Sequence, residues 1–102
     1  MSEPTGSTRF SAVIAELWDV IESRRDADPE TSYTARLLQG PEDKLLKKIA
    51  EESGEVIMAA KDGDPAHLRY EIGDVMYHLL VVMARWGVTP DELAEDLAAR
   101  RT

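Results

Sequence analysis

The chain has 102 residues, of which 43% are hydrophobic, and its 20 acidic and 12 basic side chains give a formal net charge of −8. This length fits one domain, at the low end of the sizes that bury a sufficient core alone, so association with another chain would help to bury apolar surface. The negative charge would repel a nucleic-acid backbone, so we expect no nucleic acid among the partners. The sequence contains no cysteine, which excludes disulfides, thiolate metal sites and a cysteine nucleophile.

No apolar run approaches the roughly 20 residues that a membrane-spanning helix needs, so we expect no membrane partner. Residues 1–8 lack the apolar core of a signal peptide and are expected to form a flexible polar tail. A single domain should therefore occupy residues 9–102, and the cytoplasm is the expected compartment.

The spacing of apolar residues predicts an all-α fold with four main helices, and no segment alternates like a strand. The first helix is expected over about residues 10–25, where apolar side chains recur at intervals of three and four. The connection over residues 27–40 contains turn-forming residues. It is expected to include one or two helical turns at Ala35 to Leu38.

Turn and capping signals delimit three further helices. The second should run from Pro41, a residue suited to the first turn, to about Lys61. The third should follow a turn at residues 62–64, end near Gly87 and form an antiparallel hairpin with the second. A capping box over residues 89–92 opens a last helix to about residue 100. The expected core side chains of the hairpin are Leu45, Leu46, Ile49, Val56, Ile57, Leu68, Ile72, Val75, Met76, Leu79, Val82 and Met83.

Acidic residues follow a regular spacing on both helices of this hairpin. The second helix contains Glu51-Glu52-x-x-Glu55 and the third contains Glu71-x-x-Asp74. Residues three or four apart share a helix face, so the two sets can converge where the helices meet. Converging carboxylates would repel each other, and a hard divalent cation such as Mg²⁺ would relieve that repulsion. This arrangement favours phosphoryl chemistry, in which the ion neutralises phosphate charge.

A structural alternative also fits the spacing. Lys47 and Lys48 precede the acidic residues at the right distance for ion pairs on a solvated helix face. In that case the protein would be a non-catalytic helical interaction module.

Three segments of this hairpin, residues 44–56, 59–64 and 70–81, together with residues 27–38 of the first connection, closely resemble the phosphoribosyl-ATP pyrophosphohydrolase family. That family belongs to the MazG-like all-α pyrophosphatase superfamily. The resemblance implies a helical bundle assembled as a homodimer. It also implies magnesium-dependent hydrolysis of 1-(5-phosphoribosyl)-ATP to 1-(5-phosphoribosyl)-AMP and pyrophosphate, the second step of histidine biosynthesis. A house-cleaning nucleoside triphosphate pyrophosphatase of the same superfamily is the nearest alternative.

The resemblance also assigns candidate roles. It implies that Glu52, Glu55, Glu71 and Asp74 are the magnesium ligands, and Glu51 is an additional acid that could orient water. Cationic and hydroxyl side chains are candidates for binding the substrate phosphates. Each has a plainer reading as helix pairing, turn chemistry or core packing. These substrate-binding candidates are Lys44, Lys48, Arg36, Tyr33, Thr34 and His78.

Overall fold

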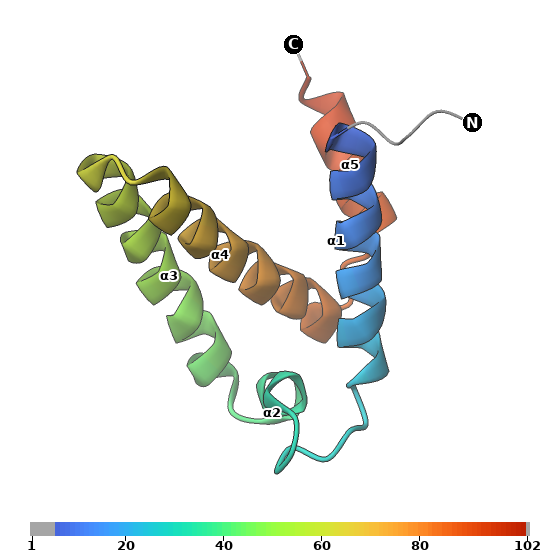
Figure 1. The fold of residues 1–102 in the computed structure, drawn as a ribbon. Helices are drawn as coiled ribbons and strands as arrows, with labels where there is room; N and C mark the ends of the chain where they lie inside the picture. The colour runs from blue at the N-terminus through green and yellow to red at the C-terminus, as the bar shows by residue number, and fades with distance from the viewer. Residues whose placement is uncertain (1–5, 102) are drawn as a thin grey trace.

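The computed structural model describes residues 6–101, and within this range the chain forms five helices and no strand (Figure 1). The all-α class is therefore confirmed. The helix beyond the four expected ones is short and lies over residues 33–39 of the first connection, where one or two helical turns were expected. No helix in the described part of the chain is both long and apolar enough to cross a membrane. The helices are α1 (Gly6–Ser23), α2 (Tyr33–Gln39), α3 (Glu42–Asp62), α4 (Pro65–Trp86) and α5 (Pro90–Ala99).

Helix α1 begins earlier than the apolar pattern indicated. Gly6, Ser7 and Thr8 were expected to belong to the N-terminal tail, but they form the first turn, and the Ser11 hydroxyl donates to the Ser7 carbonyl at 3.0 Å. Small polar residues contribute nothing to an apolar stripe, so the pattern starts only at Phe10. The rest of the expected tail, residues 1–5, lies outside the described residues.

Helices α3 and α4 form the expected antiparallel hairpin, and the contact between them is the most extensive one between helices (Figure 1). Its turn depends on Gly63, which ends α3 in the left-handed region with φ of 69°. Such a φ favours glycine because it has no Cβ. Asp64 then begins α4 by accepting hydrogen bonds from the backbone N–H groups of Ala66 and His67.

The core lies where α1, α2, α3 and α4 meet, and it is small. Several expected core positions of the hairpin are in fact exposed, namely Leu46, Ile57, Ile72 and Leu79, whereas Leu45 is fully buried as expected. A helical apolar stripe shows which face avoids water but not whether its own chain covers that face. The buried cluster consists of Ile21, Leu37, Leu45, Leu80, Val81 and Ala84.

Side-chain bonds to backbone carbonyls hold the end of α2 against α4 and against the start of the preceding connection. Arg85 of α4 donates to the Leu37 carbonyl at 2.7 Å. The Gln39 amide donates to the carbonyls of Arg25 and Ala27 at 2.9 and 2.8 Å. The Arg85 bond satisfies one of the carbonyls that the last turn of a helix leaves without a partner, and the Gln39 bonds fix α2 to the preceding connection.

At the end of α2, Gly40 allows a close approach that no other residue permits. Its N–H donates to the Arg36 carbonyl at 2.8 Å, and a Cβ built on Gly40 would lie 2.7 Å from the same oxygen. The contact is with backbone, so a side chain at position 40 must move α2 relative to α3.

We predict that Gly40→Ala lowers the free energy of unfolding by about 1–3 kcal/mol, the usual cost of overpacking. The matched control is Gly73→Ala in α4, where a Cβ meets nothing within 4 Å. That change should be neutral or stabilising by up to about 1 kcal/mol, because alanine favours helix over glycine. Denaturant titrations of both variants measure the difference, and equal stabilities would contradict the predicted clash.

Candidate functional site

Carboxylates from α3 and α4 converge in the middle of the hairpin. Glu52 of α3 and Glu71 and Asp74 of α4 each offer an oxygen, and these atoms all lie within 4.8 Å of one another. The register of the hairpin explains this meeting. Glu52 and Asp74 are both eleven residues from Gly63, so an antiparallel hairpin places them at the same height.

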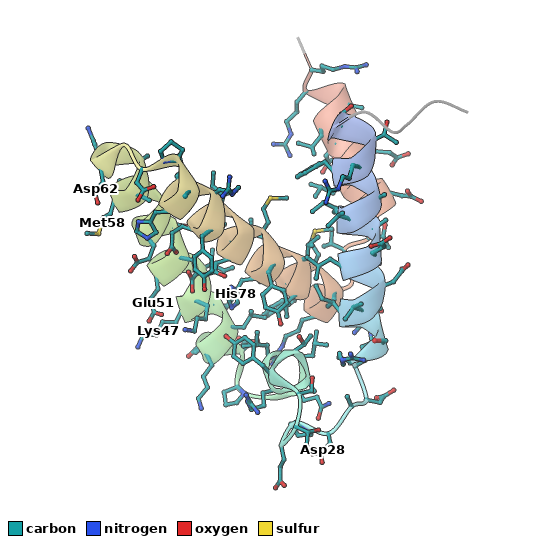
Figure 2. All side chains as sticks on the ribbon, in the orientation of Figure 1. Asp28, Lys47, Glu51, Met58, Asp62 and His78 are labelled. Carbon is teal, nitrogen blue, oxygen red and sulfur yellow. The ribbon has the colours of Figure 1, made fainter. Side chains whose placement is uncertain are left out.

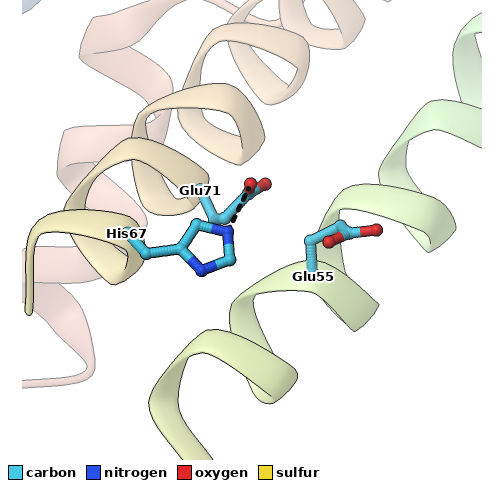
Figure 3. Close-up of side chains that lie close together, drawn as sticks. All are labelled: Glu55, His67 and Glu71. Atoms are coloured by element: carbon cyan, nitrogen blue, oxygen red, sulfur yellow. Dashed lines mark hydrogen bonds and ion pairs between the residues drawn. The ribbon is translucent and has the colours of Figure 1, made fainter. Parts of the chain in front are cut away.

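A second group adjoins the first and shares Glu71 with it. Glu55 and Glu71, each eight residues from the turn, approach the imidazole of His67, again with ligand atoms within 4.8 Å (Figure 3). His67 Nε2 lies 3.2 Å from Glu71 Oε1. Because an ionised carboxylate only accepts hydrogen bonds, the imidazole N–H donates to Glu71. Glu71 is only 8% exposed, so this histidine is an important partner of a nearly buried acid.

The clustered acids have a measurable electrostatic cost. The pKa of Glu52 is raised above its usual value, first by burial and then by the negative charges of Asp74 and Glu71. The neighbouring His78 and Lys48 oppose this shift only in part. Oxygen donors that repel each other at this spacing fit a hard divalent cation, which would hold such ligands at about 2.1 Å from itself if it is magnesium.

Glu51 belongs to a different environment from the other acids. It forms ion pairs with Lys47 at 3.9 Å and with Lys48 at 3.8 Å, and it belongs to neither carboxylate group. Figure 2 shows Lys47 and Glu51 projecting from α3 on the side away from α4. The ion-pair alternative raised by the sequence therefore describes Glu51, whereas Glu52 and Asp74 form no ion pair within residues 6–101.

A pocket of about 620 Å³ adjoins the carboxylates, between α2, the connection before it and the first half of α3. It contains four cationic side chains and a single carboxylate, although the chain as a whole is strongly acidic. Four of the six candidates for substrate binding line it, namely Lys44, Lys48, Arg36 and Tyr33. The lining residues are Pro29, Tyr33, Arg36, Gln39, Gly40, Pro41, Lys44, Lys47, Lys48 and Glu51.

The other two candidates, Thr34 and His78, do not line this pocket. His78 Nδ1 is 2.8 Å from the Asp74 carbonyl and its Nε2 is 3.1 Å from the Tyr33 hydroxyl. The carbonyl can only accept, so Nδ1 carries a proton, and Nε2 shares a hydrogen bond with the Tyr33 hydroxyl. The Thr34 hydroxyl bonds to that of Tyr77. His78 thus connects the pocket wall to the helix turn that presents Asp74.

Two residues of the site were not among the sequence candidates. His67 was given no role, and Lys47 was considered only in the ion-pair alternative. Both are four residues before an acid that they contact, His67 before Glu71 and Lys47 before Glu51. The i,i+4 spacing was therefore the available signal for each.

An all-helical chain whose central hairpin gathers acidic side chains beside a basic pocket has the architecture of the MazG-like all-α pyrophosphatases. The profile of the phosphoribosyl-ATP pyrophosphohydrolase family matches residues 14–101. The chain belongs to this family.

Individual relatives agree with this assignment. The chain is 49% identical to the phosphoribosyl-ATP pyrophosphatase of Pelotomaculum thermopropionicum, over 87% of this chain and 91% of that protein. It is 44% identical to the phosphoribosyl-ATP pyrophosphatase of Nitrosomonas eutropha, over 91% and 80% of the two chains. A histidine biosynthesis bifunctional protein of Parasynechococcus marenigrum is 50% identical over 84% of this chain, which covers 39% of that longer protein.

The raised pKa of Glu52 predicts how stability depends on pH without metal. Protonated Glu52 is favoured in the folded state, so its contribution is present at low pH and is lost as the pH rises through its raised pKa. We predict that Glu52→Gln removes this loss, makes the metal-free protein more stable at neutral pH, and weakens stabilisation by added magnesium. Thermal melts across this pH range, with and without magnesium, measure all three effects.

Glu51→Gln is the matched control, since it removes only exposed ion pairs with Lys47 and Lys48. Its stability should stay equal or fall slightly. A Glu52→Gln protein that is less stable than wild type at neutral pH without metal would contradict the clustered-charge interpretation.

Proposed function

We propose that this chain hydrolyses 1-(5-phosphoribosyl)-ATP to 1-(5-phosphoribosyl)-AMP and pyrophosphate, the second step of histidine biosynthesis. The observation that supports this most directly is the meeting of a carboxylate cluster and a basic pocket in a chain of this family. The substrate is a highly charged nucleotide that does not cross a lipid bilayer unaided, so we assign the reaction to the cytoplasm.

Magnesium is the proposed cofactor. Glu52, Glu71 and Asp74 would hold it, with Glu55 beside them at the shared Glu71. When bound, the ion would neutralise the phosphate charge and make the attacked phosphorus more electrophilic. His67 keeps the Glu71 carboxylate oriented toward the cluster, as partners behind metal ligands commonly do.

The chain's own residues would position water and phosphate. The reaction breaks the anhydride bond between the α and β phosphates, and water supplies the oxygen that caps the attacked phosphorus. Glu51 lines the pocket and pairs with Lys48, whose charge also acts on Glu52, and it is the proposed acceptor of a hydrogen bond from that water. Lys48 ion-pairs with Glu51 and also lowers the pKa of Glu52, so it is placed to meet a phosphate at the border of the two regions. No covalent intermediate is needed.

A homodimer is the proposed assembly. The described residues leave many large apolar side chains exposed, including Ile57 and Met58 at 63% each and Tyr70 at 67%. Helix α5 buries none of its residues. A second copy of the chain would remove this surface from water through a symmetric interface.

We predict that the protein sediments as a dimer at micromolar concentration, because a small core alone leaves too much apolar area in water. Sedimentation velocity over a range of protein concentrations is the measurement. A fully active protein that sediments as a monomer at every concentration would refute the proposed assembly.

The proposed activity predicts the outcome of a substrate panel. Pyrophosphate release should be far faster from 1-(5-phosphoribosyl)-ATP than from ATP, dUTP or other triphosphates, and it should need magnesium. The house-cleaning alternative predicts comparable rates on several triphosphates. A non-catalytic interaction module predicts no release from any of them. The assay is pyrophosphate detection with and without magnesium, with Glu71→Gln as an inactive control.

A further inference from the structure

The basic pocket and the carboxylate cluster are separate binding regions. Lys44 and Glu52 are eight residues apart on α3, which corresponds to about 12 Å along the helix axis. None of Glu52, Glu71 and Asp74 lines the pocket, so a phosphate held at the level of Lys44 lies at a different height on α3 from the cluster. Lys48 lines the pocket and its charge also acts on Glu52, so the two regions adjoin at this residue.

Three cationic side chains of this pocket are suited to a phosphate group of their own. Lys44 forms no ion pair within residues 6–101, so its charge is available to a ligand. Arg36 packs on the Tyr33 ring, 5.6 Å from its centroid, and donates to the Pro29 carbonyl at 2.8 Å. These contacts fix the guanidinium group at the pocket without neutralising it. Lys47 adds a third cation to the same wall.

The proposed substrate carries two anionic ends. One is the triphosphate that is cleaved, and the other is the 5-phosphate of the ribosyl group attached to N1 of the adenine. We infer that the pocket formed by Arg36, Lys44 and Lys47 is the subsite for this second, non-reacting phosphate, while the triphosphate lies at the carboxylate cluster. The inference rests on the proposed function.

Such a subsite would determine specificity. A site built to bind a charged group rejects analogues that lack it, because its cations then remain without their partner. Ordinary nucleoside triphosphates have no phosphate apart from the triphosphate chain, so they could fill the cluster but not the pocket. The same pocket therefore separates the proposed enzyme from a general triphosphate pyrophosphatase, and binding energy from the remote phosphate would orient the reacting end.

The test compares two substrates that differ only in this phosphate, 1-(5-phosphoribosyl)-ATP and 1-ribosyl-ATP. The ratio of their kcat/KM values should favour the phosphorylated substrate in wild type and should fall by about tenfold or more in Lys44→Ala and in Lys47→Ala. Lys61→Ala is the matched control, an exposed lysine of the same helix outside the pocket, and should keep the wild-type ratio. Circular dichroism verifies that each variant is folded.

An unchanged ratio in both pocket variants overturns the subsite, whatever their absolute activity, since lysines that serve the triphosphate affect both substrates alike. Amide chemical shifts give a readout that needs no turnover. Ribose 5-phosphate at millimolar concentration, without magnesium, should shift the amides of residues 36, 44 and 47, whereas ribose should not. Failure of wild type to hydrolyse 1-(5-phosphoribosyl)-ATP refutes the proposed function alone, and absence of these shifts refutes the subsite alone.

Discussion

Repulsion among Glu52, Glu71 and Asp74 is the constraint on which the rest of this structure depends. Like charges this close are tolerated only because the hairpin is held together elsewhere, by the turn at Gly63 and by apolar contacts nearer the other end of α4. The turn also sets the register, since acids at equal distances from it lie at equal heights. The packing of the hairpin thus offsets the repulsion within this cluster of acids.

The pocket beside the cluster depends on a different set of bonds. Helix α2 is too short to be stable alone, and side chains of Gln39 and Arg85 fix it to the preceding connection and to α4. Tyr33 extends this support to the cluster, because its hydroxyl bonds to the His78 ring that in turn bonds to the Asp74 carbonyl. The position of the cationic wall is therefore linked through hydrogen bonds to the position of an acid in the cluster.

Much of this arrangement could be predicted from local patterns in the sequence. Helix ends were indicated by Gly63, Asp64 and the Thr89 capping box, because those residues act through backbone bonds within a few positions. The ExxE and ExxD spacing indicated converging acids because residues three or four apart share a helix face. The exposure of Ile57 and Ile72 could not be predicted, since a periodic pattern does not distinguish a core from a surface awaiting a partner. The separate environment of Glu51 could not be predicted either, because it depends on how α4 packs against α3 in the tertiary structure.

The uneven charge of the molecule affects how a substrate reaches it. The overall field of a chain with net charge −8 opposes the approach of a polyanion, whereas the cationic pocket attracts it within a Debye length of about 8 Å at physiological ionic strength. Encounters at most of the surface are thus discouraged, and those at the pocket are favoured. A molecule with charge at both ends would be captured first by the end that binds the pocket, and its other end would then have only a short distance to search for the cluster.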